Sequence, residues 1–109
     1  MTMTKSGIVY KFGDVVLVEV PFTDSAHVKL RPALVLFEEL DNVIVAGITS
    51  NQSMQGILIT KDEGLVADSI IKINYIFTVS KHKIKRLLVS LSEEKKELVR
   101  KEVRKRIGL

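Results

Sequence analysis

Apolar residues over most of the chain fall into short runs separated by polar turns. The run from Val15 to Val20 is rich in β-branched residues, which favour strands. Pro21 ends this run because proline cannot donate a hydrogen bond to a sheet. The same pattern predicts further strands over residues 33–37, 43–49, 56–60 and 69–79, the last as one long strand or two short ones. Residues 22–30 are predicted to form a loop, and residues 80–86 a basic turn.

From Ser92 onward the pattern changes to that of a helix. Ser92 is a suitable N-cap, and glutamates follow it near the positive end of the helix dipole. Val99, Val103 and Ile107 recur every four residues and so share one helix face, and Gly108 suits the C-terminal cap. Short strands followed by one helix predict a mainly β fold. We expect a small antiparallel barrel or a strongly curled sheet, with the helix over an open side.

The length and composition limit the class of protein. A chain of 109 residues is predicted to form one domain, residues 1–109. No apolar run approaches the roughly 20 residues of a membrane helix, and the polar segment Met1 to Ser6 lacks the apolar core of a signal peptide. These features predict a cytoplasmic protein without membrane contact. The absence of cysteine excludes disulfides and thiolate zinc sites, and no other spaced set of ligands predicts a metal or cofactor.

The charge is unevenly distributed along the chain. Residues 1–80 hold 6 Lys/Arg and 9 Asp/Glu, a net charge of −3, whereas residues 81–109 hold 11 Lys/Arg and 4 Asp/Glu, a net charge of +7. A basic tail on an acidic body is consistent with an anionic partner such as nucleic acid. A more common origin of such a tail is a solvated helix rich in Lys and Glu.

One arginine stands apart as a candidate for chemistry. Arg31 follows the predicted loop and directly precedes an apolar strand, and Pro32 biases it towards an extended conformation. The surrounding sequence belongs to an ordered set of motifs that resembles the PemK/MazF family of toxin ribonucleases. The motifs are Gly13-Asp14-Val15-Val16, Pro21-Phe22-Thr23-Asp24, Lys29-Leu30-Arg31-Pro32-Ala33-Leu34-Val35-Leu36, Ile48-Thr49-Ser50, and Gly64-Leu65 with Ser69.

The resemblance implies a compact SH3-like (PemK/CcdB-like) β-barrel with a C-terminal helix, usually as a homodimer. Members of the family cleave single-stranded RNA without a metal, and a cognate antitoxin peptide blocks their RNA groove. Arg31 and Thr49 match the family's functional arginine and threonine, and Ser50 and Ser69 match positions beside the site. Two departures bear on substrate preference and activity. Residues 25–30 lack the glycine and the glutamine or glutamate common there, and Val89 replaces a common glycine.

The expected reaction needs no metal, because the RNA 2′-hydroxyl can itself attack the adjacent phosphorus. Arg31 offers a planar, permanently charged fork that fits phosphate oxygens, so its expected role is to stabilise charge in the transition state. Thr49 offers a hydroxyl donor to the same phosphate. The alternative interpretation of Arg31 is a structural ion pair with Asp14 or Glu19.

The general base is not evident from the sequence. His27 has a suitable ordinary pKa of about 6.5 and lies in the loop before the candidate arginine, although a solvent-exposed loop residue is the more common role at such a place. Asp24 is the second candidate, and Glu63 and Asp68 are further ones. His82 lies among lysines and is more typical of a basic surface turn.

Aromatic, basic and hydroxyl residues supply candidate contacts to RNA. Phe22, Tyr75 and Phe77 can stack on bases, although aromatic residues of a small barrel more often belong to its core. The predicted substrate-binding residues are Phe22, Lys29, Ser50, Asn51, Ser69, Lys83 and Lys85.

Three functions of different classes fit these observations. The first is a type II toxin that cleaves RNA. The second is a barrel that has lost cleavage and only binds RNA or an antitoxin peptide. The third is a toxin that targets a protein, because a related barrel fold poisons DNA gyrase. Retention of Arg31 and Thr49 favours the first over the second, and the third depends on fold alone, which is poor evidence of function.

Overall fold

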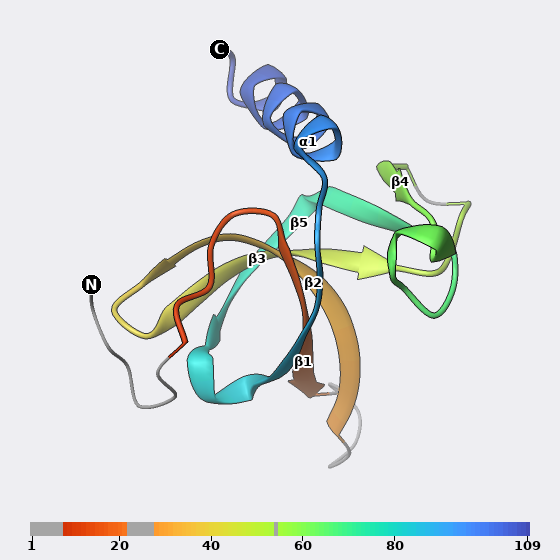
Figure 1. Cartoon of the computed structure of the whole chain (residues 1–109). Coiled ribbons are helices and arrows are strands. Elements are labelled where there is room, and N and C mark those ends of the chain that lie inside the picture. Colours follow the sequence, from red (N-terminus) through yellow and green to blue (C-terminus); the bar gives the residue numbers. More distant parts are fainter. Residues whose placement is uncertain (1–7, 22–27, 54) are drawn as a thin grey trace.

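The computed structural model describes residues 8–21, 28–53 and 55–109, and over these ranges six strands form one antiparallel sheet (Figure 1). The strand order across the sheet is β4-β5-β3-β2-β1-β6. The elements are β1 (Asp14–Pro21), β2 (Val28–Glu39), β3 (Asn42–Thr49), β4 (Ile57–Ile59), the 3₁₀ turn η1 (Lys61–Glu63), β5 (Ser69–Ser80), the 3₁₀ turn η2 (Lys81–Lys83), β6 (Ile84–Ser90) and α1 (Glu93–Arg106). The predicted mainly β fold with a terminal helix is confirmed.

Both faces of the sheet are buried, one beneath the helix and the other by the curl of the sheet itself. On the helix face, Leu34 and Ile71 form one cluster with Val99 of α1. The opposite face, which we call the inner face, carries a second cluster, the inner cluster. Its buried members are Tyr10, Val16, Val18, Ala33, Val35, Val43, Val45, Val79 and Ile84. No helix of the described residues covers this cluster, yet most of its side chains are fully buried. The sheet therefore curls around them (Figure 1).

A break in the register of β5 helps to produce this curl. Where β3 steps from Ala46 to Gly47, the partner on β5 jumps from Ile76 to Lys72. Residues 73–75 therefore bulge out of the ladder, and a bulge bends its strand. The segment predicted as one long strand or two short ones is thus one strand that bends in its middle.

The terminal helix follows its sequence pattern with one exception. Ser92 is the N-cap, and its hydroxyl oxygen accepts a backbone N–H of the first turn at 3.2 Å. Val99 is fully buried, and Val103 packs against the same cluster. Ile107 was expected on this face but is 65% exposed, because it lies at the C-cap, beyond the last residue of α1. In the described part of the chain, no helix is long and apolar enough to cross a membrane.

The sequence predictions are wrong at the start of β2 and miss strand β6 altogether. β2 begins at Val28, so residues 28–30 are strand and not loop, and Val28 pairs with Pro21 across β1 and β2. β6 begins at Ile84, inside the predicted basic turn, of which only residues 81–83 form a turn. Lys85 and Arg86 obscured this strand in the sequence. Charged residues are common on edge strands such as β6, where they discourage unwanted pairing.

A buried ion pair closes one end of the inner face. Lys81 Nζ lies 2.8 Å from Glu38 Oε2, and the two side chains are 5% and 8% exposed. The backbone N–H of Tyr10 donates to the same carboxylate at 2.8 Å, and the Lys81 ammonium lies 5.5 Å from the centroid of the Tyr10 ring. Burial raises the pKa of Tyr10, and the carboxylates of Glu38 and Asp14 add to this effect. We call this region the closed end.

Candidate active site

The other end of the inner face is open because β2 and β3 part there. Their pairing ends at Ala33 and Gly47. The preceding residue on β2 is Pro32, which has no N–H to continue a ladder. β2 nevertheless stays paired with β1 through Arg31 and beyond. The separation leaves Arg31 on one side and Thr49, at the end of β3, on the other.

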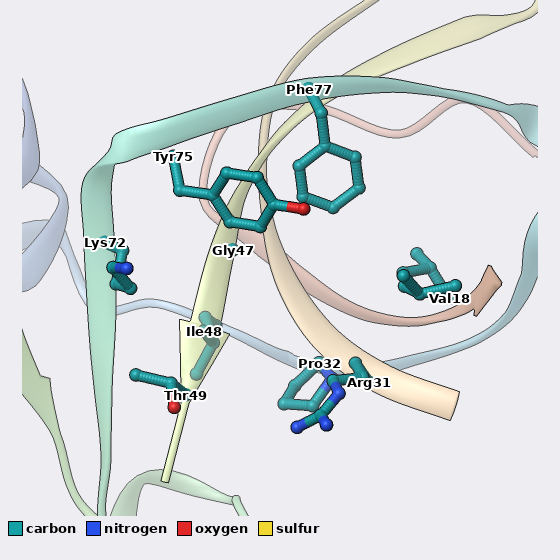
Figure 2. A pocket seen from close by; sticks show the side chains of 10 residues that line it. Val18, Arg31, Pro32, Gly47, Ile48, Thr49, Lys72, Tyr75 and Phe77 are labelled. Carbon is teal, nitrogen blue, oxygen red and sulfur yellow. The ribbon is translucent and has the colours of Figure 1, made fainter. Parts of the chain in front are cut away.

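A hollow of about 290 Å³ lies at this open end (Figure 2). The register explains its lining, because directly paired residues of an antiparallel ladder point to the same face. Arg31 pairs with Val18 of the inner cluster, and Gly47 pairs with Lys72. Thr49 lies two residues after Gly47 and so shares its face. The lining residues are Val18, Val20, Arg31, Pro32, Gly47, Ile48, Thr49, Lys72, Tyr75 and Phe77.

Arg31 has no carboxylate partner within the described ranges. Asp14 instead accepts hydrogen bonds from a backbone N–H at 3.1 Å and from a serine hydroxyl at 2.9 Å. Glu19 pairs with two lysines, one from η2 and one from β6. The structural ion pair considered for Arg31 is therefore formed with neither carboxylate. Arg31 lies on strand β2, and none of the described carboxylates neutralises its charge.

The turn after β3 fixes the hydroxyl of Thr49. Thr49 Oγ1 accepts the backbone N–H of Asn51 at 3.1 Å, so its own hydrogen can still be donated to a further acceptor. Asn51 Oδ1 in turn accepts the backbone N–H and the hydroxyl of Ser53, at 3.1 and 2.6 Å. These hydrogen bonds within the turn hold the Thr49 hydroxyl in place as a donor.

A second hollow, of about 340 Å³, adjoins the first on the helix face. Arg31, Pro32 and Ile48 line both hollows, so Arg31 stands between them. Arg86 of β6 also lines the second hollow. Two arginines therefore border one continuous surface, which suits a chain with more than one phosphate.

Two of the predicted hydroxyl contacts, Ser50 and Ser69, line this second hollow. Ser50 is exposed at the start of the turn after β3. Ser69 is 5% exposed, and its hydroxyl donates to the carbonyl oxygen of Ala67 at 2.9 Å. Ser69 can therefore offer a ligand only its acceptor lone pairs, while Ser50 lies at the surface.

The carboxylates of Glu63 and Asp68 are engaged in local structure. Glu63 Oε2 accepts the backbone N–H and the hydroxyl of Thr60 at 2.7 and 3.1 Å and lies 3.5 Å from Lys95 Nζ. Burial alone would raise the pKa of Glu63, but these hydrogen bonds and Lys95 outweigh it, and the pKa is lowered. Asp68 Oδ1 accepts the backbone N–H of Lys61 at 2.7 Å. Neither carboxylate lines either hollow, so both fit capping roles better than that of a general base.

The predicted basic contacts lie outside the described lining of both hollows. Lys83 lies 3.8 Å from the Glu19 carboxylate, and Lys85 forms a closer ion pair with it. The hydrogen bond from Lys85 is the main cause that lowers the pKa of Glu19, and the charges of both lysines add to it against some desolvation. Lys29 and His82 are exposed on β2 and η2.

The sequence analysis did not single out two cations that line the hollows, Lys72 and Arg86. Lys72 is the one charged residue in the apolar run 69–79, and a lone lysine in such a run is a usable signal because lysine is rarely buried. Arg86 counted only as part of a basic segment. Phe22, Asp24 and His27 lie outside the described residues. Within the described ranges, no group of three or more His, Cys, Asp or Glu side chains is placed to hold a metal ion.

Known proteins resemble this chain in both sequence and fold. The family model described as PemK-like, MazF-like toxin of type II toxin-antitoxin system matches residues 11–107. Among solved structures, the Mycobacterium tuberculosis toxin MazF-mt6 is similar with a TM-score of 0.72 and 20% identity, over 88% of this chain and 97% of that one. An endoribonuclease in complex with its cognate antitoxin, from a mycobacterial species, has a TM-score of 0.72 and 12% identity, over 93% and 95% of the chains. No curated protein sequence matches the chain.

Proposed function

Because the chain belongs to the PemK-like, MazF-like toxins of type II toxin–antitoxin systems, we propose that it is a toxin endoribonuclease. Its substrate is single-stranded RNA, mRNA in particular, which it cleaves in the cytoplasm without a metal or cofactor. The observation that carries the proposal is the open end of the inner face. There Arg31 and Thr49 line one hollow, and Arg31 has no carboxylate partner among the described residues.

In the proposed reaction the RNA 2′-oxygen bonds to the adjacent phosphorus while the bond to the 5′-oxygen breaks. The leaving 5′-oxygen takes a proton from solvent water, so the products are a 2′,3′-cyclic phosphate and a 5′-hydroxyl. Arg31 binds the non-bridging oxygens and stabilises the negative charge that builds up on them. Thr49 donates its hydroxyl hydrogen to the same phosphate. Arg86, across the second hollow, holds a neighbouring phosphate.

The proton of the 2′-hydroxyl passes to Asp24 or His27 in this proposal. The described lining of the first hollow contains no carboxylate or imidazole, whereas both candidates belong to the segment that joins β1 to β2. If the cleavage rate rises with pH through an apparent pKa of about 6.5, and His27→Ala removes this rise, the general base is His27. If the rate instead rises through an apparent pKa of about 3.9, and Asp24→Asn removes this rise, the general base is Asp24.

Further contacts to the RNA follow the motif positions. Ser50 and Ser69 border the second hollow, and Asn51 holds the turn beside Thr49. The remaining contacts in this proposal are Phe22, Lys29, Lys83 and Lys85. In this proposal the three lysines contact phosphates and position the RNA, whereas Phe22 contacts a base, and base contacts determine the cleavage sequence.

We expect a homodimer that a cognate antitoxin peptide inhibits. Leu87 on the edge strand β6 is 50% exposed and Leu98 on α1 is 47% exposed, and an edge strand carries unpaired backbone groups. The mycobacterial endoribonuclease of similar fold was solved with its cognate antitoxin. The basic C-terminal segment suits an acidic peptide. A monomer by light scattering at micromolar concentration would contradict the dimer.

Incubation with single-stranded RNA in EDTA tests the proposal. The wild-type protein should cut, and Arg31→Ala should lose about 100–1000-fold in rate, as removal of one preorganised donor typically does, while its thermal midpoint stays unchanged. Arg104→Ala is the matched control, because it removes the same charge from an exposed position on α1. If the protein binds RNA without cutting it, the result would favour the inactive barrel. If it neither binds nor cuts RNA, the result would favour the protein-targeting toxin. Normal cleavage by a folded Arg31→Ala protein would refute the assignment.

A further inference from the structure

Two aromatic rings lie side by side along β5 at the wall of the first hollow (Figure 2). The ring centroids of Tyr75 and Phe77 are 4.9 Å apart, with an interplanar angle of 32°. Phe77 packs against the inner cluster, whereas Tyr75 is 51% exposed. Phe77 therefore belongs to the core and supports Tyr75, whose ring projects into the open part of the hollow. A core role does not account for so large an apolar ring at the surface.

Gly47 lets the Tyr75 ring lie against the backbone of β3. A Cβ atom at this position would lie 2.6 Å from Cδ2 and 3.2 Å from Cε2 of Tyr75. The first distance is well inside van der Waals contact, so any larger residue displaces the ring. Glycine is needed here for its size, because its backbone conformation is one that other residues adopt. The register of β3 and β5 thus sets the ring in one place.

Cations border this ring. Lys72 Nζ lies 5.9 Å from the centroid of Tyr75, and Arg31 lines the same hollow. An exposed aromatic face next to a line of positive charge is the arrangement with which proteins hold single-stranded nucleic acid, the base on the ring and the backbone along the cations. An apolar peptide or ligand would gain nothing from the two charges.

We propose that Tyr75, backed by Phe77 and Gly47, stacks the nucleobase next to the scissile phosphate, and that Lys72 contacts the phosphate on the far side of that nucleotide. The inference rests on the proposed RNA cleavage at Arg31. Stacking of this kind tolerates every base, so the subsite anchors the strand and sets its register without choosing the sequence.

The test uses a 2′-O-methyl single strand, which binds without being cleaved. Tyr75→Leu should weaken its binding about 5- to 150-fold, the usual range for one stacked base, whereas Tyr75→Phe keeps the ring and should bind as the wild type does. Gly47→Ala should weaken binding in the same direction because it moves the ring. A strand that lacks the base at the stacked position should bind the wild type more weakly by the same factor. The loss of this base should not weaken the binding of Tyr75→Leu any further.

Cleavage of ordinary RNA separates this inference from the proposed function. Tyr75→Leu should raise the half-saturating RNA concentration and leave the saturated rate near that of the wild type, because stacking contributes equally to the bound substrate and the transition state. Wild-type cleavage together with unchanged binding in Tyr75→Leu would overturn the stacking subsite and leave Arg31 in place. A wild-type protein that neither binds nor cuts RNA would overturn both.

Discussion

The inner face of the sheet has a cation at each end, and the two cations have opposite surroundings. At the closed end, Lys81 is almost fully buried, pairs with Glu38 at 2.8 Å and lies over the Tyr10 ring. At the open end, Arg31 is half-buried and has no carboxylate partner among the described residues. It faces Thr49 across a hollow that also contains Lys72.

This contrast separates a structural charge from the one that we propose to be functional. A buried charge is tolerated when the fold supplies its counter-ion, and the counter-ion then neutralises it for any ligand. At the open end the described residues supply cations and hydrogen-bond donors but no carboxylate. RNA contacts are predicted for Lys83 and Lys85 of the segment 80–86, whereas Lys81 of the same segment is unavailable to RNA because it already pairs with Glu38.

The largest expected effect is on stability, at the closed end. Lys81→Met leaves the Glu38 carboxylate buried without its partner, and breaking one side of a buried ion pair costs about 3–5 kcal/mol. Chemical denaturation should show this loss as a lower midpoint with an unchanged slope. Folded Lys81→Met protein should cleave RNA at the wild-type rate.

A double variant sharpens the same prediction. Lys81→Met combined with Glu38→Gln removes both charges and keeps an amide oxygen that can accept the Tyr10 N–H. It should recover most of the stability that the single variant loses. No recovery would show that packing of the lysine stem, rather than the unpaired carboxylate, determines stability at the closed end.

A smaller effect is expected at the open end from Thr49→Ala. The proposed hydrogen bond from Thr49 to the phosphate is neutral and worth about 1 kcal/mol, so its loss should slow cleavage about fivefold, well below the loss in Arg31→Ala. Thr49→Ser restores the hydroxyl and should restore the rate in single-turnover assays. A loss as large as that of Arg31→Ala would mean that Thr49 has a second role, such as holding the turn through Asn51.

The smallest effect concerns the basic residues beside β1. Neutralising Lys83 and Lys85 together should flatten the dependence of RNA affinity on salt by roughly one unit in log–log form, at about 0.7 per phosphate contact on a single strand. Glu19 already offsets part of this charge. An unchanged slope would reassign the two lysines to the antitoxin or to solvent, and would leave Arg31, Lys72 and Arg86 as the described cations that line the two hollows.

The sequence predicted the elements better than their arrangement. Local patterns were sufficient for the Ser92 cap and for the strand around Val45, because caps and β-branched runs depend on neighbours in sequence. β6 was missed since Lys85 and Arg86 sit on an edge, where tertiary pairing overrides a polar pattern.

The candidate site was partly predictable for the same reason. Arg31 and Thr49 stand at motif positions, so the sequence alone could nominate them. The role of Gly47, and the place of Lys72 in the same hollow as Arg31, depend on the register break in β5. No local pattern reports such a break, because it arises from pairing between strands distant in the chain.

Backbone NMR of the labelled protein during titration with a 2′-O-methyl single-stranded RNA tests the central claim most directly. The two ends of the inner face give separate signals in one experiment. We expect the amides of Arg31, Thr49 and Lys72 to shift progressively while those of Tyr10 and Lys81 stay in place. Shifts confined to the closed end, or to α1 alone, would contradict the claim that RNA binds where the sheet lies open.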